Sequence, residues 1–135
     1  MPAAWRSRWA PPPLAHLRWR EAYTYRWFCR YAEAWQAAEE GVRLHIAGAD
    51  LRLEAMCQRE VGLAARESGD YRRAQESLER ALVLFAELND AVYEIHVLGN
   101  LATLFWYVGE YEKAMELACQ ALARCFVNIL YAPLW

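Results

Sequence analysis

Apolar residues recur every three or four positions along most of the chain, a spacing that is typical of amphipathic α-helices. The segment after Asp50 shows this most clearly, with apolar residues at Leu53, Met56, Cys57, Val61, Ala64 and Ala65. Asp50 is placed to cap the first turn, because its side chain can accept hydrogen bonds from free backbone amides. Gly69 is placed to end the helix, because glycine adopts the left-handed conformation at little cost.

A second helix is predicted from about Tyr71 to Leu88, after the turn at Gly69. Its apolar residues also fall on one face of a helix: Ala74, Leu78, Ala81, Leu82 and Phe85. The two helices together form a helix-turn-helix unit.

This unit recurs when the chain is shifted by forty residues, which gives approximate units at 14–49, 50–89 and 90–128. The matched positions are glycines at the turn (Gly69, Gly109), tyrosines after it (Tyr31, Tyr71, Tyr111) and small residues (Gly62 with Ala102; Ala34 with Ala74 and Ala114; Gly41 with Ala81 and Ala121). We expect the glycine to make the turn and the small residues to let two helices approach closely. The tyrosine should pack on the preceding helix and keep its hydroxyl near water.

The repeated segments REVGLAARESGDYRRAQESLERAL and LGNLATLFWYVGEYEKAMELACQAL resemble the tetratricopeptide repeat over a full unit each. Unit one is a weaker match, since Cys29 replaces the turn glycine and Gly41 replaces the third small residue. The resemblance covers residues 14 to 125. It implies an all-α fold, a right-handed α-solenoid of about three helix-turn-helix repeats, in a single domain spanning 1–135.

The forty-residue period is longer than the usual repeat of about 34 residues. In this it resembles the longer repeats of large bacterial regulators, such as activators of the maltose-regulon type. The resemblance implies a non-catalytic module that binds a protein or peptide, in bacterial regulation or complex assembly.

The first helix of each unit is expected to line the concave face of such a solenoid. Counting by the family register, the candidate partner-binding residues are Trp19, Arg20, Tyr23, Trp27, Arg59, Leu63, Arg66, His96, Asn100, Thr103, Trp106 and Tyr107, and the same face holds His16, Arg26, Met56 and Glu60. This set is rich in Trp, Tyr and Arg, the residue types enriched at binding hot spots.

Asn100 resembles the asparagine that hydrogen-bonds a bound peptide's backbone in related arrays, and an amide can donate and accept at once. The arginines could pair with carboxylates of a partner. A plainer interpretation stays open: Asn100 bridges helices, the aromatic residues belong to the core, and Arg59 and Glu60 neutralise each other as surface charges.

Charge is unevenly distributed over the chain. Residues 1–30 contain six arginines and one acid, whereas the whole chain has a net charge of −2. Either the chain starts with an ordinary basic helix, or a basic arm meets phosphate or an acidic partner. The negative net charge and the lack of a known nucleic-acid fold make nucleic acid the weaker of these partners.

No catalytic or metal-binding pattern occurs. The four cysteines form no CxxC pair, the three histidines are scattered, and no nucleophile elbow, phosphate loop or HExxH motif is present. We therefore expect no cofactor, no metal and no enzyme activity, and we expect the thiols to be reduced. With no secretory signal and no apolar run of membrane-spanning length, the sequence predicts a cytoplasmic protein that does not enter a membrane.

The tail at 126–135 is almost wholly apolar. Three alternatives remain open: the tail folds back as a cap, it docks on a second copy or another domain, or the chain is a piece of a longer protein. Docking on a second copy would make the chain a self-associating module and a homo-oligomer.

Overall fold

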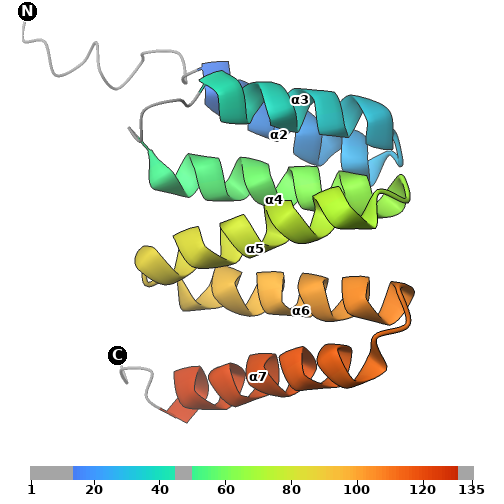
Figure 1. Ribbon diagram of the computed structural model, residues 1–135. Coiled ribbons are helices and arrows are strands. Elements are labelled where there is room, and N and C mark those ends of the chain that lie inside the picture. Colours follow the sequence, from blue (N-terminus) through green and yellow to red (C-terminus); the bar gives the residue numbers. More distant parts are fainter. Residues whose placement is uncertain (1–13, 45–49, 131–135) are drawn as a thin grey trace, which may run out of the picture.

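The computed structural model describes residues 14–44 and 50–130, which form six α-helices and no strand. They are α2 (Leu14–Trp27), α3 (Tyr31–Leu44), α4 (Leu51–Glu67), α5 (Tyr71–Glu87), α6 (Ala91–Tyr107) and α7 (Tyr111–Leu130). Consecutive helices pack in pairs, and the pairs stack from α2 and α3 at one end to α7 at the other (Figure 1). The predicted all-α solenoid is confirmed.

The four described turns share one backbone geometry. Cys29, Gly69, Asn89 and Gly109 all have positive φ, at 56°, 86°, 53° and 84°. The amide after each of them donates to a carbonyl five residues earlier, as Asp70 N does to Ala65 O at 2.9 Å. This pattern satisfies carbonyls at the end of the preceding helix. Cys29 therefore takes the conformation that glycine adopts in the other units.

Aspartates cap the helices that follow. Asp50 and Asp90 start α4 and α6, and their carboxylates accept from the amides of Leu53 (3.1 Å) and Tyr93 (3.2 Å). Asp70 caps α5 in the same way. The predicted cap at Asp50 is confirmed, and the other two explain why helices begin at a fixed distance after each turn.

The predicted role of Gly62 is confirmed by its surroundings. A Cβ atom placed on Gly62 would lie 2.6 Å from Cγ of Leu78 and 3.3 Å from the carbonyl oxygen of Ala74. The backbone of α4 thus touches α5 directly. At Gly41 an added Cβ would lie 2.7 Å from Sγ of Cys57, so α3 and α4 also meet closely.

Each later first helix inserts apolar side chains between the two helices of the preceding unit. Leu53, Cys57 and Val61 of α4 cluster with residues of α2 and α3. At the equivalent positions of α6, Val97 and Leu101 join the main core with α4 and α5. These side chains are 0–6% exposed. The burial of this i, i+4, i+8 series holds the solenoid together.

Candidate functional site

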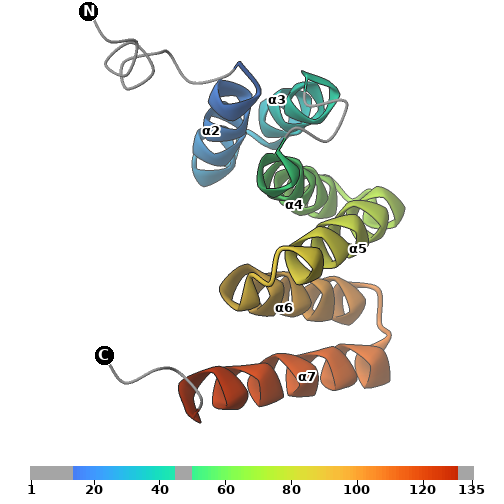
Figure 2. The same cartoon turned by 90° about the vertical axis from the view of Figure 1, so that its left-hand side faces the viewer.

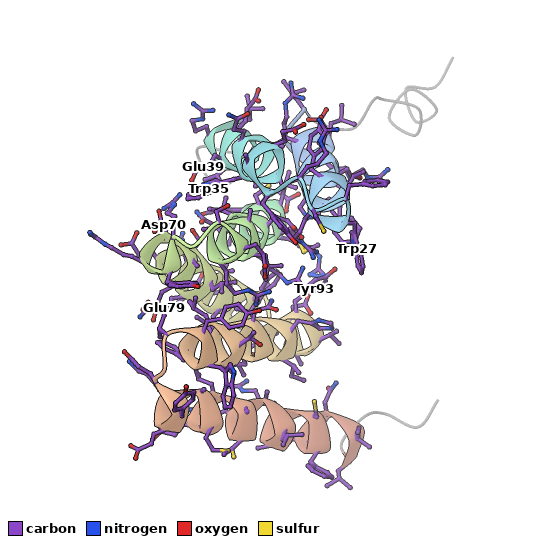
Figure 3. All side chains as sticks on the ribbon, turned by 90° about the vertical axis from the view of Figure 1, so that its right-hand side faces the viewer. Trp27, Trp35, Glu39, Asp70, Glu79 and Tyr93 are labelled. Carbon is purple, nitrogen blue, oxygen red and sulfur yellow. The ribbon has the colours of Figure 1, made fainter. Side chains whose placement is uncertain are left out.

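In the α2–α3 and α4–α5 pairs the first helix lies toward the same side of the stack, and α6 is offset from α5 toward that side as well (Figure 2). Figure 3 shows the same division in side chains: Trp27 of α2 and Tyr93 of α6 lie opposite Trp35, Glu39, Asp70 and Glu79. We call the surface formed by α2, α4 and α6 the A-helix face.

Four aromatic side chains form a ladder along α2. The ring centroids are 5.4 Å apart for His16 and Trp19, 6.1 Å for Trp19 and Tyr23, and 6.1 Å for Tyr23 and Trp27. Residues three and four apart are neighbours on a helix, which brings the rings together. The ladder is half-buried at Trp19 and reaches 65% exposure at Trp27. A large apolar contact surface is therefore open at this end of the A-helix face.

A buried carboxylate connects α2 to α4. Glu60 is 1% exposed, and Arg26 approaches it with Nε 2.7 Å from Oε2 and Nη2 3.4 Å from Oε1. Nη1 of Arg59 lies 3.4 Å from the same Oε1. Arg26 also lies over the rings of Tyr23 and Trp27, at 5.4 and 5.7 Å. The interpretation of Glu60 and Arg59 as ordinary surface charges is wrong, because the contact with Arg26, 34 residues earlier in the chain, holds the carboxylate in the interior.

Arg59 occupies an unusual electrostatic position. Burial lowers its pKa, the nearby Glu60 carboxylate partly offsets this, and the Arg26 charge lowers it further. The three groups Arg26, Glu60 and Arg59 together carry a net charge of about +1, because arginine stays protonated. The centre of the A-helix face is therefore cationic.

Each of the three A-helix-face helices carries a buried nitrogen donor with no acceptor among the described residues. These donors are Nε1 of Trp19, Nε of Arg59 and Nδ2 of Asn100. A buried donor without a partner costs about 1–3 kcal/mol. All three residues belong to the predicted partner-binding set, so a rotation of these side chains toward an incoming acceptor would be favourable.

Other predicted residues find partners within the chain. Arg66 lies over the ring of Tyr107 at 5.6 Å and pairs with Glu67 at 3.1 Å, and Tyr107 contacts Tyr71 with centroids 6.4 Å apart. Nε of Arg20 donates to His16 at 3.2 Å. His96 is exposed beside Tyr93, at 5.9 Å.

Three predicted residues lie elsewhere than expected. Leu63 is only 4% exposed, because α4 is packed between the α2–α3 pair on one side and α5 and α6 on the other. Thr103 and Trp106 line a hollow of about 380 Å³ between α6 and α7. Trp106 is 61% exposed and packs on Tyr111, with centroids 4.8 Å apart.

The tyrosines that follow the turns pack in two ways. Tyr111 contacts Trp106 of the preceding helix, as predicted, whereas Tyr71 contacts the ring of Tyr107 in the following unit.

The part of the chain that the structure describes contains no group of three His, Cys, Asp or Glu side chains that could hold a metal ion. None of its helices is long and apolar enough to span a membrane. Within α2 and the turn after it, Arg18, Arg26 and Arg30 each pair with a carboxylate. Arg6, Arg8 and residues 131–135 of the apolar tail lie outside the described residues, while residues 126–130 continue α7.

Comparisons with known proteins agree with this architecture. A family model described as tetratricopeptide repeat matches residues 58–125. The crystal structure of the TPR domain of Arabidopsis FLU superposes with a TM-score of 0.77, covering 84% of this chain and 95% of that chain. The two sequences are 18% identical, so this likeness is one of fold. No curated protein matches the chain.

Proposed function

The chain belongs to the tetratricopeptide repeat family, whose fold generally mediates protein–protein interaction, and from this premise we propose that the A-helix face binds a segment of a partner protein. The proposed role is non-catalytic: the face holds a polypeptide in place and does no chemistry on it.

One observation carries the proposal: the A-helix face presents the exposed aromatic ladder on α2 and, on each of α2, α4 and α6, a buried nitrogen donor with no acceptor among the described residues. The ladder offers rigid apolar area, of the kind that dominates binding energy at interfaces. Within residues 14–44 and 50–130, the donors on Trp19, Arg59 and Asn100 have no acceptor. A polypeptide supplies acceptors along its whole length as backbone carbonyls.

The positive charge at the centre of the A-helix face favours partner segments that carry acidic side chains. The cationic centre around Arg59 favours a segment that carries at least one carboxylate, which could accept a charge-assisted hydrogen bond from Nε. Asn100 would then bind the backbone of the same segment, whatever its side chains. We therefore propose an acidic peptide segment with an apolar residue that packs near Trp27.

We further propose that this binding serves regulation or complex assembly in the bacterial cytoplasm. The forty-residue period supports this, because it resembles the long repeats of bacterial regulators. Expression of the chain in a bacterial host, followed by fractionation, would test the compartment.

A displayed library of random peptides, panned against the protein, would test the binding proposal, because panning selects peptides by affinity alone. The face variant is Trp27→Ala with Asn100→Ala. The matched control is Val83→Ala, an apolar residue on α5 that is 49% exposed and lies in the opposite layer of helices. Far-ultraviolet circular dichroism confirms that each variant is folded.

We expect enriched peptides to be acidic, and to bind the face variant about tenfold or more weakly than the wild type and the Val83→Ala control. Replacement of the peptide's carboxylates by amides should weaken binding to the wild type. Peptides that bind all three proteins equally would refute the placement of the site on the A-helix face.

A further inference from the structure

The exposed side of α7 carries an unbroken apolar stripe. Its members alternate in spacing between four and three residues: Tyr111, Met115, Ala118, Leu122, Cys125 and Ile129. This is the spacing of the seam between two packed helices. Met115, Leu122 and Ile129 are 66%, 60% and 73% exposed, and Phe126 beside them is 64% exposed. We call these residues the α7 stripe.

The equivalent surface is covered by a helix in both preceding units. Forty residues earlier, Leu78 is fully buried and Leu82 is partly buried in the core that α5 forms with α6. In the first unit, Ala38 and Trp35 of α3 pack with Val61 of α4. The third groove of this kind, between α6 and α7, is the hollow lined by Ala102, Ala114 and Ala118. A helix is therefore the shape that this surface fits.

The two halves of α7 are complementary to each other. Its first half borders the hollow, where small residues such as Ala114 and Ala118 lie. Its second half projects Leu122, Phe126 and Ile129 into solvent. We propose that a second copy of the chain covers this surface, with the two α7 helices antiparallel about a two-fold axis near Gln120. Each second half then enters the hollow of the other copy, so the contact is made twice.

The charges on α7 favour the antiparallel direction. Glu112 and Glu116 lie in its first half and Glu110 directly before it, offset only by Lys113, whereas the second half has no acid and carries Arg124. A parallel pair would bring the acidic halves of two copies together, and like charges repel. An antiparallel pair places each acidic half beside the apolar half of the other copy.

The opposite end of the solenoid does not fit the hollow. Glu21 of α2 occupies the position at which α4 and α6 carry the buried Val61 and Leu101. Glu21 also pairs with Arg18, at 2.7 Å. Insertion of α2 from another copy would place this charge in an apolar groove, at a cost in desolvation. A closed dimer through α7 is therefore favoured over a head-to-tail polymer.

The size of the surface suits a dimer. A helix of 20 residues is about 30 Å long. With a width of about 10 Å, α7 alone offers about 300 Å². The hollow and the adjoining strip of α6 around Trp106 add to this area, toward the about 800 Å² that each partner buries in a stable complex. The stripe does not overlap the aromatic ladder, so this proposal does not rest on the function proposed for the A-helix face.

Sedimentation equilibrium of the full chain tests the proposal. We expect a species of twice the 15.7 kDa chain mass. Leu122→Glu and Phe126→Glu should each raise the dissociation constant of the dimer by about tenfold or more. Val83→Glu on α5, a matched exposed site, should leave it unchanged. A monomer at all concentrations up to about 100 µM, or a dimer that both α7 variants leave intact, would overturn the proposal.

Cysteine cross-linking tests the direction of the helices. In a background with Cys29, Cys119 and Cys125 replaced by alanine, antiparallel packing brings Met115→Cys of one copy beside Phe126→Cys of the other. A mild oxidant should then link the two variants when mixed, and link neither to its own copy. Links within each single variant would indicate parallel packing and contradict the proposed geometry, as would open polymers in sedimentation.

Discussion

Replacing Gly62 by alanine tests the close approach of α4 and α5. The added Cβ would lie 2.6 and 2.9 Å from Cγ and Cδ2 of Leu78, and Leu78 is fully buried. Overpacking of this kind costs about 1–3 kcal/mol. Alanine gains about 1 kcal/mol over glycine in a helix interior. We therefore expect Gly62→Ala to reduce the free energy of unfolding by about 1 kcal/mol.

Gly99→Ala is the matched control. Gly99 also lies in the middle of a 17-residue first helix, but an added Cβ there would meet nothing within 4 Å. The helix-propensity gain then acts alone, and the variant should be more stable than the wild type by about 0.5–1 kcal/mol. The same chemical change should thus have opposite effects at two sites.

Thermal unfolding followed by circular dichroism measures both effects. For a chain of this size, 1 kcal/mol corresponds to about 3–5 °C in Tm. We expect the Tm of Gly62→Ala to fall by a few degrees and that of Gly99→Ala to rise by a similar amount. Equal stabilisation of both variants would refute the tight packing of α4 on α5.

Three further predictions follow from single residues. Glu60→Gln should lower the free energy of unfolding by about 3 kcal/mol, because it removes the buried carboxylate that pairs with the half-buried Arg26 and Arg59. Glu76→Gln, at an exposed pair, should change it by less than about 0.5 kcal/mol. Equal effects in urea titrations would contradict the network around Glu60. Cys29→Gly should stabilise the protein by about 1 kcal/mol, because Cys29 holds a positive φ that glycine adopts without strain. A loss of stability in the same titrations would contradict the positive φ at Cys29. Burial raises the pKa of Cys57 to about 12. Above pH 9 the Cys57 thiol ionises in the unfolded chain but stays protonated in the folded one. The free energy of unfolding should therefore fall more steeply with rising pH in the wild type than in Cys57→Ala. Equal slopes of the two stability profiles against pH would show that the thiol is not buried.

The sequence was sufficient to predict the helices and turns because these depend on local patterns. The forty-residue match placed the turns at Gly69 and Gly109, and Asp50 identified a helix start. The same match aligns Cys29 with the turn glycines Gly69 and Gly109, and Cys29 shares their positive φ. These features need only the spacing of residues along the chain.

Burial on the A-helix face was less predictable, because it depends on which helices lie next to a position. Leu63 and Thr103 occupy equivalent positions, yet Leu63 is buried within the stack and Thr103 borders an open hollow. Periodicity gives the direction of a side chain but not the presence of a neighbouring helix. The contact of Arg26 with Glu60 was missed for a similar reason, since the packing of α2 on α4 decides which charges meet.

Photo-cross-linking of a bound peptide would show whether a partner segment lies along α2, α4 and α6. A peptide selected by panning would carry a benzophenone group at its apolar position, and mass spectrometry would identify the labelled residues. We expect labels near Trp27 and on α4 or α6, and we expect these labels to be lost in the Trp27→Ala, Asn100→Ala protein. Labels confined to α3, α5 or the α7 stripe would contradict it.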